Sequence, residues 1–175
     1  MIEKFKKENQ SIKDKYLLLK NISLFINKNF YYNDNWENNN NYVEKYNKKT
    51  GIHLNNPLSF MTDSKSGLCG AFAELFIDIA KEFNIESYYV GGFLKKDDGP
   101  HAWVVVKLND KYYFIDPTWN QNDNNLEFFL LGEHSFSKTH DLSPNNIIIT
   151  NNQNNLLNEI DKEIILRKVS IENYR

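Results

Sequence analysis

The sequence predicts an α+β fold, with helices and antiparallel strands in separate stretches of the chain. Residues 12–30 and 69–83 carry apolar residues at three- and four-residue spacing, the period of a helix with one buried face. Residues 102–108 and 111–115 are rich in β-branched and aromatic residues and flank a short polar turn. Because helices come first and paired strands follow, we expect an α+β architecture.

The N-terminal part of the chain is predicted to contain one main helix, at residues 12–30. Its apolar stripe consists of Leu18, Ile22, Phe25, Ile26 and Phe30. Residues 31–57 are polar and rich in Asn, which predicts a loop with a short helix at about 42–48. Asn56-Pro57 is expected to end any helix there, because a residue before proline avoids helical backbone angles.

The helix that begins at Cys69 is the clearest predicted element. Its unbroken stripe at helical spacing is formed by Cys69, Phe72, Ala73, Phe76, Ile77, Ala80 and Phe83. Ser66 is the predicted N-cap and Asn84 the predicted end of the helix. Gly67 and Gly70 lie on either side of the cysteine and let other backbone segments approach it closely.

Strands are predicted from residue 86 onward. The first covers residues 86–90 and ends at Gly91-Gly92. Residues 102–108 and 111–115 are predicted to pair as a hairpin around Asn109-Asp110. A further strand is expected at residues 127–131.

The C-terminal part of the chain is predicted to be irregular and then helical. Residues 137–155 include an Asn-rich stretch and show no regular period. The final helix is expected at about 156–169, with its buried side formed by Leu157, Ile160, Ile164 and Val169.

Length and composition limit the classes of protein. At 175 residues, the chain is expected to be a single domain over residues 1–175, with its core at about 60–142. The formal net charge is −2, and the only arginines are Arg167 and Arg175, so we expect no nucleic-acid partner. No apolar run is long enough to span a membrane and no signal segment is recognisable, so a cytoplasmic location is the default expectation.

The single cysteine excludes an intramolecular disulfide and a Cys-rich zinc site. The four histidines do not show the spacing of metal ligands, so the sequence predicts no metal and no cofactor. One cysteine on an apolar helical stripe is, taken alone, most often a packing residue. Whether Cys69 has a functional role therefore depends on which other side chains the fold brings close to it.

Cys69 lies at the predicted start of a helix, where unpaired N–H groups and the helix dipole favour a negatively charged sulfur. A thiolate attacks amide and ester carbonyls, and the same N–H groups can stabilise the oxyanion that forms. Cys69 is thus a candidate nucleophile that needs an imidazole as its base.

The predicted hairpin supplies that imidazole together with a carboxylate. If Asn109-Asp110 is a two-residue loop, Leu108 pairs with Lys111, and Asp116 falls opposite Trp103. His101 then lies two positions along on the same face of the hairpin, about 7–8 Å away across the strands, a span that the two side chains can bridge. The spacing therefore predicts that Asp116 orients His101 and leaves one ring nitrogen for the thiol of Cys69.

The segments GLCGAFAELF and HAWVVVKLNDKYYFIDPTW resemble the core of the transglutaminase-like superfamily. The family pattern is Gly-x-Cys-Gly-x-x-Ala, then His-Ala-Trp, then Asp-Pro-Thr-Trp, and Cys69, His101 and Asp116 fall on its triad positions in its order. The likeness is strong over residues 65–120. It continues more weakly through residues 128–130 and Thr139-His140, as in bacterial members related to cytokinesis proteins.

The resemblance implies a papain-like α+β fold and acyl transfer from amides, with protease, amidase and transglutaminase activities all known in the family. It implies a protein or peptide substrate, and hydrolysis is slightly favoured over transfer to an amine. The oxyanion site would combine the Cys69 backbone N–H with a donor from Tyr32, Asn33 or Trp36. Trp103 and Trp119 are expected to pack the sheet and to line the cleft, with core packing favoured, and His140 is a further candidate cleft residue. The alternative is a binding or scaffold protein that keeps the fold without turnover, and the oligomeric state stays open.

Overall fold

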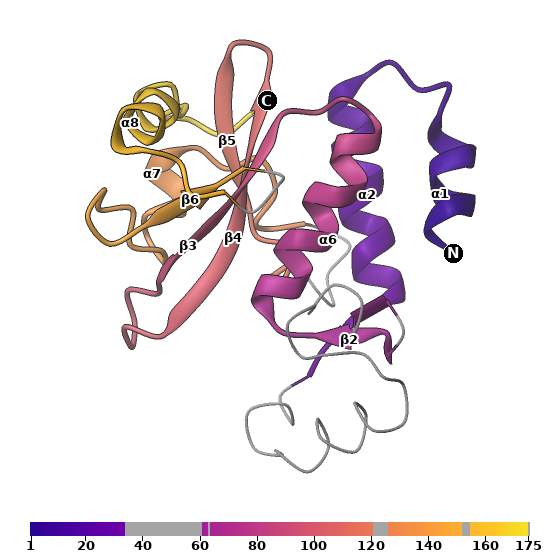
Figure 1. The fold of residues 1–175 in the computed structure, drawn as a ribbon, viewed down its shortest axis with the longest axis horizontal. Coiled ribbons are helices and arrows are strands. Elements are labelled where there is room, and N and C mark those ends of the chain that lie inside the picture. Colours follow the sequence, from indigo (N-terminus) through magenta and orange to yellow (C-terminus); the bar gives the residue numbers. More distant parts are fainter. Residues whose placement is uncertain (34–60, 63, 121–125, 152–154, 175) are drawn as a thin grey trace.

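The computed structural model of the protein describes residues 1–33, 61–62, 64–120, 126–151 and 155–174. It confirms the α+β class: helices cover both faces of a four-stranded antiparallel sheet (Figure 1). The predicted short helix at 42–48 lies outside the described residues, as do Asn56-Pro57 and the candidate oxyanion donor Trp36. None of the helices in the described part of the chain is long and apolar enough to cross a membrane.

The helices are α1 (Ile2–Asn9), α2 (Lys15–Asn29), α6 (Cys69–Glu82), α7 (Glu133–Phe136) and α8 (Glu159–Arg167). The sheet contains β3 (Ser87–Phe93), β4 (Pro100–Leu108), β5 (Lys111–Ile115) and β6 (Ile148–Thr150), in the order β5-β4-β3-β6. A separate two-stranded parallel sheet joins β1 (Tyr31–Tyr32) to β2 (Ser66–Gly67).

The predicted hairpin register is confirmed. Leu108 pairs with Lys111 across a two-residue loop, and Val104 pairs with Ile115 at the other end of the ladder. Asn109 has a φ of 55°, a left-handed conformation that Asn tolerates better than most residues. The hairpin thus carries the end of β5 to the beginning of β4, where the candidate site lies.

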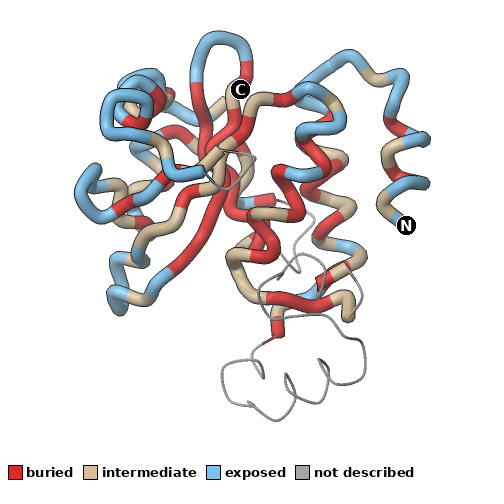
Figure 2. Tube along the Cα trace, in the orientation of Figure 1, coloured by how far each residue is buried: buried red, intermediate tan, exposed pale blue. Residues whose placement is uncertain are grey.

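Helix α6 packs against what we call the first face of the sheet, and α2 packs on α6 (Figure 1). The residues between them are mostly apolar and fully buried, as the predicted stripes require; they include Leu19, Ile22, Ile26, Phe72, Phe76, Ala80, Val104, Val106 and Ile115. Helix α2 begins three residues later than expected because Asp14 caps it, accepting from the backbone N–H groups of Tyr16 and Leu17. Figure 2 shows this buried layer running along α6.

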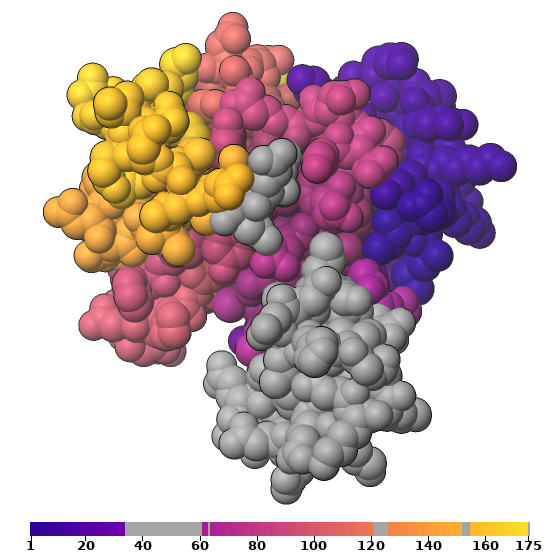
Figure 3. Space-filling view, in the orientation of Figure 1, coloured from indigo at the N-terminus to yellow at the C-terminus, as the bar shows by residue number. Residues whose placement is uncertain are grey.

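The opposite, second face of the sheet is covered by α7, α8 and the segments around them. Its core is strongly aromatic and consists of Val90, Trp103, Val105, Tyr112, Phe114, Phe136, Ile147, Ile149 and Ile165. In the space-filling view, α8 and the C-terminal segment form one flank of the surface and the N-terminal helices form the other (Figure 3). The two helical layers are therefore separated by the sheet.

Several expected boundaries are wrong. The prediction that a strand ends at Gly91-Gly92 fails, because β3 continues to Phe93. Gly92 is needed there: a Cβ at this position would lie 2.5 Å from the Trp103 ring, so only glycine lets Trp103 pack across the strand. Residues 127–131 form no strand but only a single bridge between Phe114 and Leu131.

Short elements occur where none was expected. Helix α1 was missed because it is mostly charged, although Phe5 is buried and Asn21 donates to Asn9 at 2.7 Å. Helix α7 was also missed, and the segment predicted to be irregular contains β6. Each of these elements is too short to show a clear period in the sequence.

Helix α8 exists near the predicted position, but only part of its predicted buried side is correct: Leu157 and Val169 are partly buried against the second core, and Ile160 and Ile164 are not. Ile160 and Ile164 are 71% and 47% exposed, whereas Lys162 and Ile165 are buried. The buried Lys162 ammonium donates to the backbone oxygen of Pro144 at 2.9 Å. The helix has apolar residues on both sides, and contact with the second face decides which side is covered.

Candidate active site

Cys69 is the first residue of α6, as predicted, and its thiol is partly exposed and free. The backbone N–H groups at the start of a helix have no partner within the helix, so they point toward the space beside the sulfur. The predicted cap is wrong: the N-cap is Leu68, which makes no side-chain cap. Ser66 instead lies in β2, where its hydroxyl accepts from Asn33 at 3.1 Å.

The short parallel pair β1–β2 places two of the candidate oxyanion donors beside the residues that immediately precede Cys69. Tyr32 pairs with Gly67, and the backbone N–H of Asn33 donates to the Gly67 oxygen at 3.1 Å. The Asn33 side chain is buried and already bonded to Ser66. Tyr32 and Asn33 therefore lie next to the segment that leads into α6.

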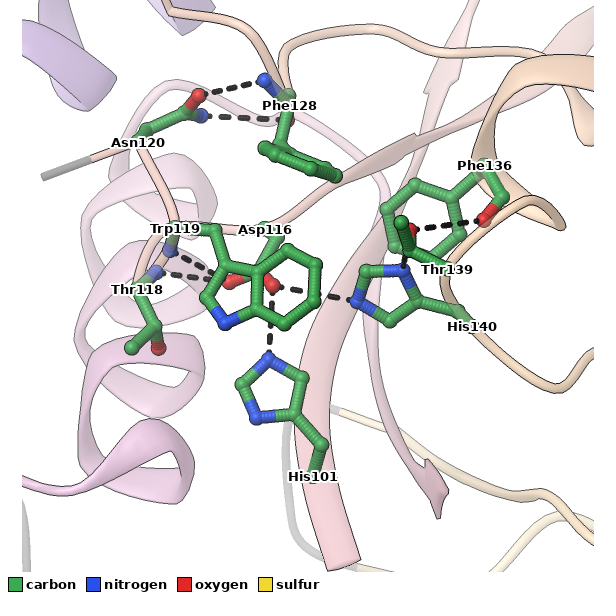
Figure 4. Close-up of polar contacts among 9 residues, drawn as sticks. All are labelled: His101, Asp116, Thr118, Trp119, Asn120, Phe128, Phe136, Thr139 and His140. Carbon is green, nitrogen blue, oxygen red and sulfur yellow. Dashed lines mark hydrogen bonds and ion pairs between the residues drawn. The ribbon is translucent and has the colours of Figure 1, made fainter. Parts of the chain in front are cut away.

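His101 and Asp116 meet at the end of the hairpin. His101 belongs to β4, Asp116 directly follows β5, and the His101 Nε2 lies 2.7 Å from the Asp116 Oδ2. Figure 4 shows the second ring nitrogen of His101 pointing away from the carboxylate. The hairpin register thus produces the contact that its parity predicts.

The Asp116 carboxylate is completely buried and accepts four hydrogen bonds. Its Oδ1 accepts from the backbone N–H groups of Thr118 at 2.9 Å and Trp119 at 3.1 Å. Its Oδ2 accepts from His101 and, at 3.2 Å, from the Nε2 of His140 (Figure 4). The carboxylate is therefore held on both oxygens, and one of them is shared by two imidazoles.

His140 is fully buried, in contrast to a residue that lines an open cleft. Its ring stacks on Phe136 with centroids 3.8 Å apart, and its Nδ1 lies 2.8 Å from the Thr139 hydroxyl. The sequence placed His140 near the site but gave no sign of its contact with Asp116, which spans 24 residues. Only the weak likeness at Thr139-His140 pointed to it.

Charges in the site are strongly coupled. Burial lowers the pKa of His101, but interactions with Asp116 and with the Cys69 thiol raise it to about 9. Burial raises the pKa of Asp116, but hydrogen bonds from His101 and His140 bring it below its usual value. Burial and the nearby charge of His101 lower the pKa of His140. The site therefore favours a charged His101, an ionised Asp116 and a neutral His140.

The aromatic residues around His101 differ in exposure. Trp103 is fully buried in the second core, so it packs the sheet and does not line an open cleft. Trp119 is partly exposed, and its ring centroid lies 5.5 Å from that of His101. Asn120 is bonded through its side chain to the backbone of Phe128, so it does not orient His101 (Figure 4).

Among the described residues, one group of side chains could in principle hold a metal ion. The ligand atoms of His101, Asp116 and His140 all lie within 4.8 Å of one another. Hydrogen bonds between these three side chains already account for their positions. We therefore interpret the group as a hydrogen-bonded cluster.

The sequence also resembles a known protein family. The family model of the transglutaminase-like superfamily matches residues 4–117, more than half of the chain. The chain therefore belongs to the transglutaminase-like superfamily. No curated protein matches the sequence.

Two solved structures are similar. One is a candidate cysteine protease from Cytophaga hutchinsonii, with 18% sequence identity and a TM-score of 0.50, covering 67% of this chain and 36% of its own. The other is a TGase, with 24% identity and a TM-score of 0.44, covering 67% of this chain and 29% of its own. The chain spans about a third of the length of these proteins, and the first supports the papain-like fold.

Proposed function

We propose that the protein is a cysteine-dependent enzyme that cleaves an amide bond of a protein or peptide, through a triad of Cys69, His101 and Asp116. The observation that carries the proposal is the hydrogen-bonded pair of His101 and buried Asp116 beside a cysteine at a helix start. Membership of the transglutaminase-like superfamily supports the same kind of chemistry.

In the proposed reaction, the Cys69 sulfur attacks the amide carbonyl carbon while His101 accepts the thiol proton. The negative carbonyl oxygen is stabilised by the Cys69 backbone N–H and by a donor from the β1–β2 region, for which Tyr32 and Asn33 are candidates. When the C–N bond breaks, His101 gives its proton to the leaving amine, and a thioester remains on Cys69. Water then hydrolyses the thioester, with His101 again moving the proton.

Asp116 keeps the Nε2–H of His101 directed at itself, which leaves Nδ1 for the thiol proton. The raised pKa of His101, about 9, stabilises the imidazolium that forms when the ring takes up the thiol proton. The imidazolium is then the acid that the leaving amine needs.

The direct test is alkylation of Cys69 by chloroacetamide at neutral pH, followed by mass spectrometry. The folded protein should react much faster than the denatured protein, and His101→Ala should lose most of that advantage. Equal rates in the folded and denatured proteins would support the alternative of a scaffold without turnover.

A second experiment separates hydrolysis from transfer. A peptide library is incubated with the protein and an excess of a primary amine that can trap the thioester. New peptide carboxylates would support water as the acceptor, and amine adducts would show that the protein is a transferase. Cys69→Ala is the control and should give neither product.

A further inference from the structure

The triad does not account for His140, although the Nε2 of this histidine is within hydrogen-bond distance of Asp116. Both imidazoles reach the same oxygen, Asp116 Oδ2, at 2.7 Å from His101 and 3.2 Å from His140. An ionised carboxylate can only accept hydrogen bonds, so each of the two Nε2 atoms must carry a proton.

The surroundings of His140 favour one protonation state. The single hydroxyl proton of Thr139 has two acceptors within reach, the Phe136 backbone oxygen at 3.3 Å and the His140 Nδ1 at 2.8 Å. The shorter contact favours donation to Nδ1, which a neutral ring with its proton on Nε2 can accept. The ring is fully buried between aromatic side chains and near the charge of His101, which disfavours a second positive charge there. Among the described residues, the titratable groups that act on the His140 ring are Asp116 and His101, and Cys69 in turn acts on His101.

We propose that His140 is a positioning residue: a neutral imidazole, kept in the Nε2–H form by Thr139, that shares the Asp116 carboxylate with His101. The proposal deepens the function proposed above and rests on it for the reaction. His140 fixes Oδ2 toward the His101 ring, while the backbone of Thr118 and Trp119 fixes Oδ1.

Sharing the carboxylate has a consequence for proton transfer. Each N–H that donates to Oδ2 takes up part of its negative charge, so Asp116 holds protonated His101 less strongly than it would alone. His101 can then release its proton to the leaving amine more readily. Without the His140 donor, the carboxylate should bind the imidazolium more tightly and raise the pKa of His101 further.

The protonation state can be read directly by NMR on ¹⁵N-histidine-labelled protein, with the four histidines assigned by substitution. His140 should show an unprotonated Nδ1 and a protonated Nε2 throughout the range in which His101 is charged. An Nδ1–H form, or a His140 ring that becomes charged near pH 6.5 like a free histidine, would overturn the proposal. This measurement needs no variant of His140 that has to fold.

The coupling is tested by the titration midpoint of His101 in two substitutions. His140→Phe keeps a ring on Phe136 but removes the donor, and should move the His101 midpoint upward by roughly half a pH unit or more. His140→Gln restores an N–H donor and should return most of that shift. An unchanged or lowered midpoint in His140→Phe would contradict the proposal.

Phe136→Leu is the matched structural control. It removes the ring that stacks on His140 and leaves the donor to Asp116 in place, so it should lower the melting temperature without moving the His101 midpoint. Chloroacetamide alkylation of Cys69 in the unsubstituted protein separates the two proposals. Fast alkylation of Cys69 without a shift of the His101 midpoint in His140→Phe would contradict the role of His140 alone. Slow alkylation together with that shift would contradict the proposed reaction alone.

Discussion

The two faces of the sheet are covered in different ways. On the first face, α2 and α6 are 15 and 14 residues long, and their periodic apolar residues are buried. On the second face, α7 and α8 are 4 and 9 residues long, and a cluster of aromatic residues with buried His140 completes the core. On the first face, the helical period of the sequence decides which residues are buried, whereas on the second face contacts between individual residues decide it.

The candidate site takes residues from both sides of the sheet. The first layer supplies Cys69 through the start of α6. Asp116 and His140 lie among the aromatic residues of the second layer, and β4 carries His101 between them. The candidate nucleophile, with the N–H groups of a helix start beside it, therefore comes from one layer, and a buried network of polar side chains comes from the other.

The largest expected effect concerns the second layer, at Asp116. Asp116→Asn keeps the shape of the side chain but removes the charge that stabilises protonated His101. We expect turnover to fall roughly ten- to a thousandfold, less than in a serine triad, because a thiolate–imidazolium pair depends less on its third member. Turnover and alkylation rate measured on the same variant check this. Asp110→Asn, the same change in the exposed hairpin loop, should have no effect.

A substitution in α6 tests the first layer. Ile79 is fully buried, and Ile79→Ala should lower the free energy of unfolding by roughly 2–5 kcal/mol, the usual cost of truncating a buried isoleucine. Urea denaturation measures the loss. A change below about 1 kcal/mol would mean that α6 does not pack on the first face as described.

Stability should also depend on pH through the second layer. The pKa of His101 in the folded protein, about 9, is above its ordinary value of 6.5, so the folded state binds its proton more tightly than the unfolded state does. The stability that this group contributes is complete below about pH 6.5 and is lost as the pH rises through about 9. Urea denaturation across this range should show the loss, and Asp116→Asn should show less of it.

A smaller effect is expected for the buried ammonium of α8. Lys162 donates to the backbone oxygens of Pro144 and Ile147 and pairs with the exposed Glu159 carboxylate. Lys162→Met keeps most of the side-chain volume but removes these interactions. The free energy of unfolding should fall by about 1–3 kcal/mol, the range for losing hydrogen bonds to a charged group. Lys168→Met, at an exposed position of the same segment, is the control and should be neutral.

The smallest effect should come from the α8 residue that the sequence placed in the core. Ile160→Ala makes the same chemical change as Ile79→Ala but at a side chain that is 71% exposed. We expect the free energy of unfolding to change by no more than about 0.5 kcal/mol. A loss as large as that of Ile79→Ala would show that Ile160 is covered in solution and would remove the contrast between the two helices.

The sequence by itself determined the α6 helix, the hairpin and the convergence of His101 and Asp116. Helical period and a two-residue turn are local properties, and a fixed strand register follows from the turn without knowledge of the rest of the fold. The same reasoning predicted a cysteine at a helix start. It wrongly predicted Ser66 as the N-cap, because Ser66 belongs to β2, where it pairs with β1 and accepts a hydrogen bond from Asn33.

Only the tertiary structure decided which side of α8 is buried, that β3 runs through Gly92, and that His140 reaches Asp116. Each depends on a partner from a distant part of the chain: the second face for Ile165, the Trp103 ring for Gly92, and Oδ2 for His140. The sequence of a short helix with apolar residues on two sides does not indicate which side is buried. A contact between an imidazole and a carboxylate 24 residues apart produces no periodic pattern in the sequence. Burial and the need to satisfy a buried charge select these contacts only when the chain has folded.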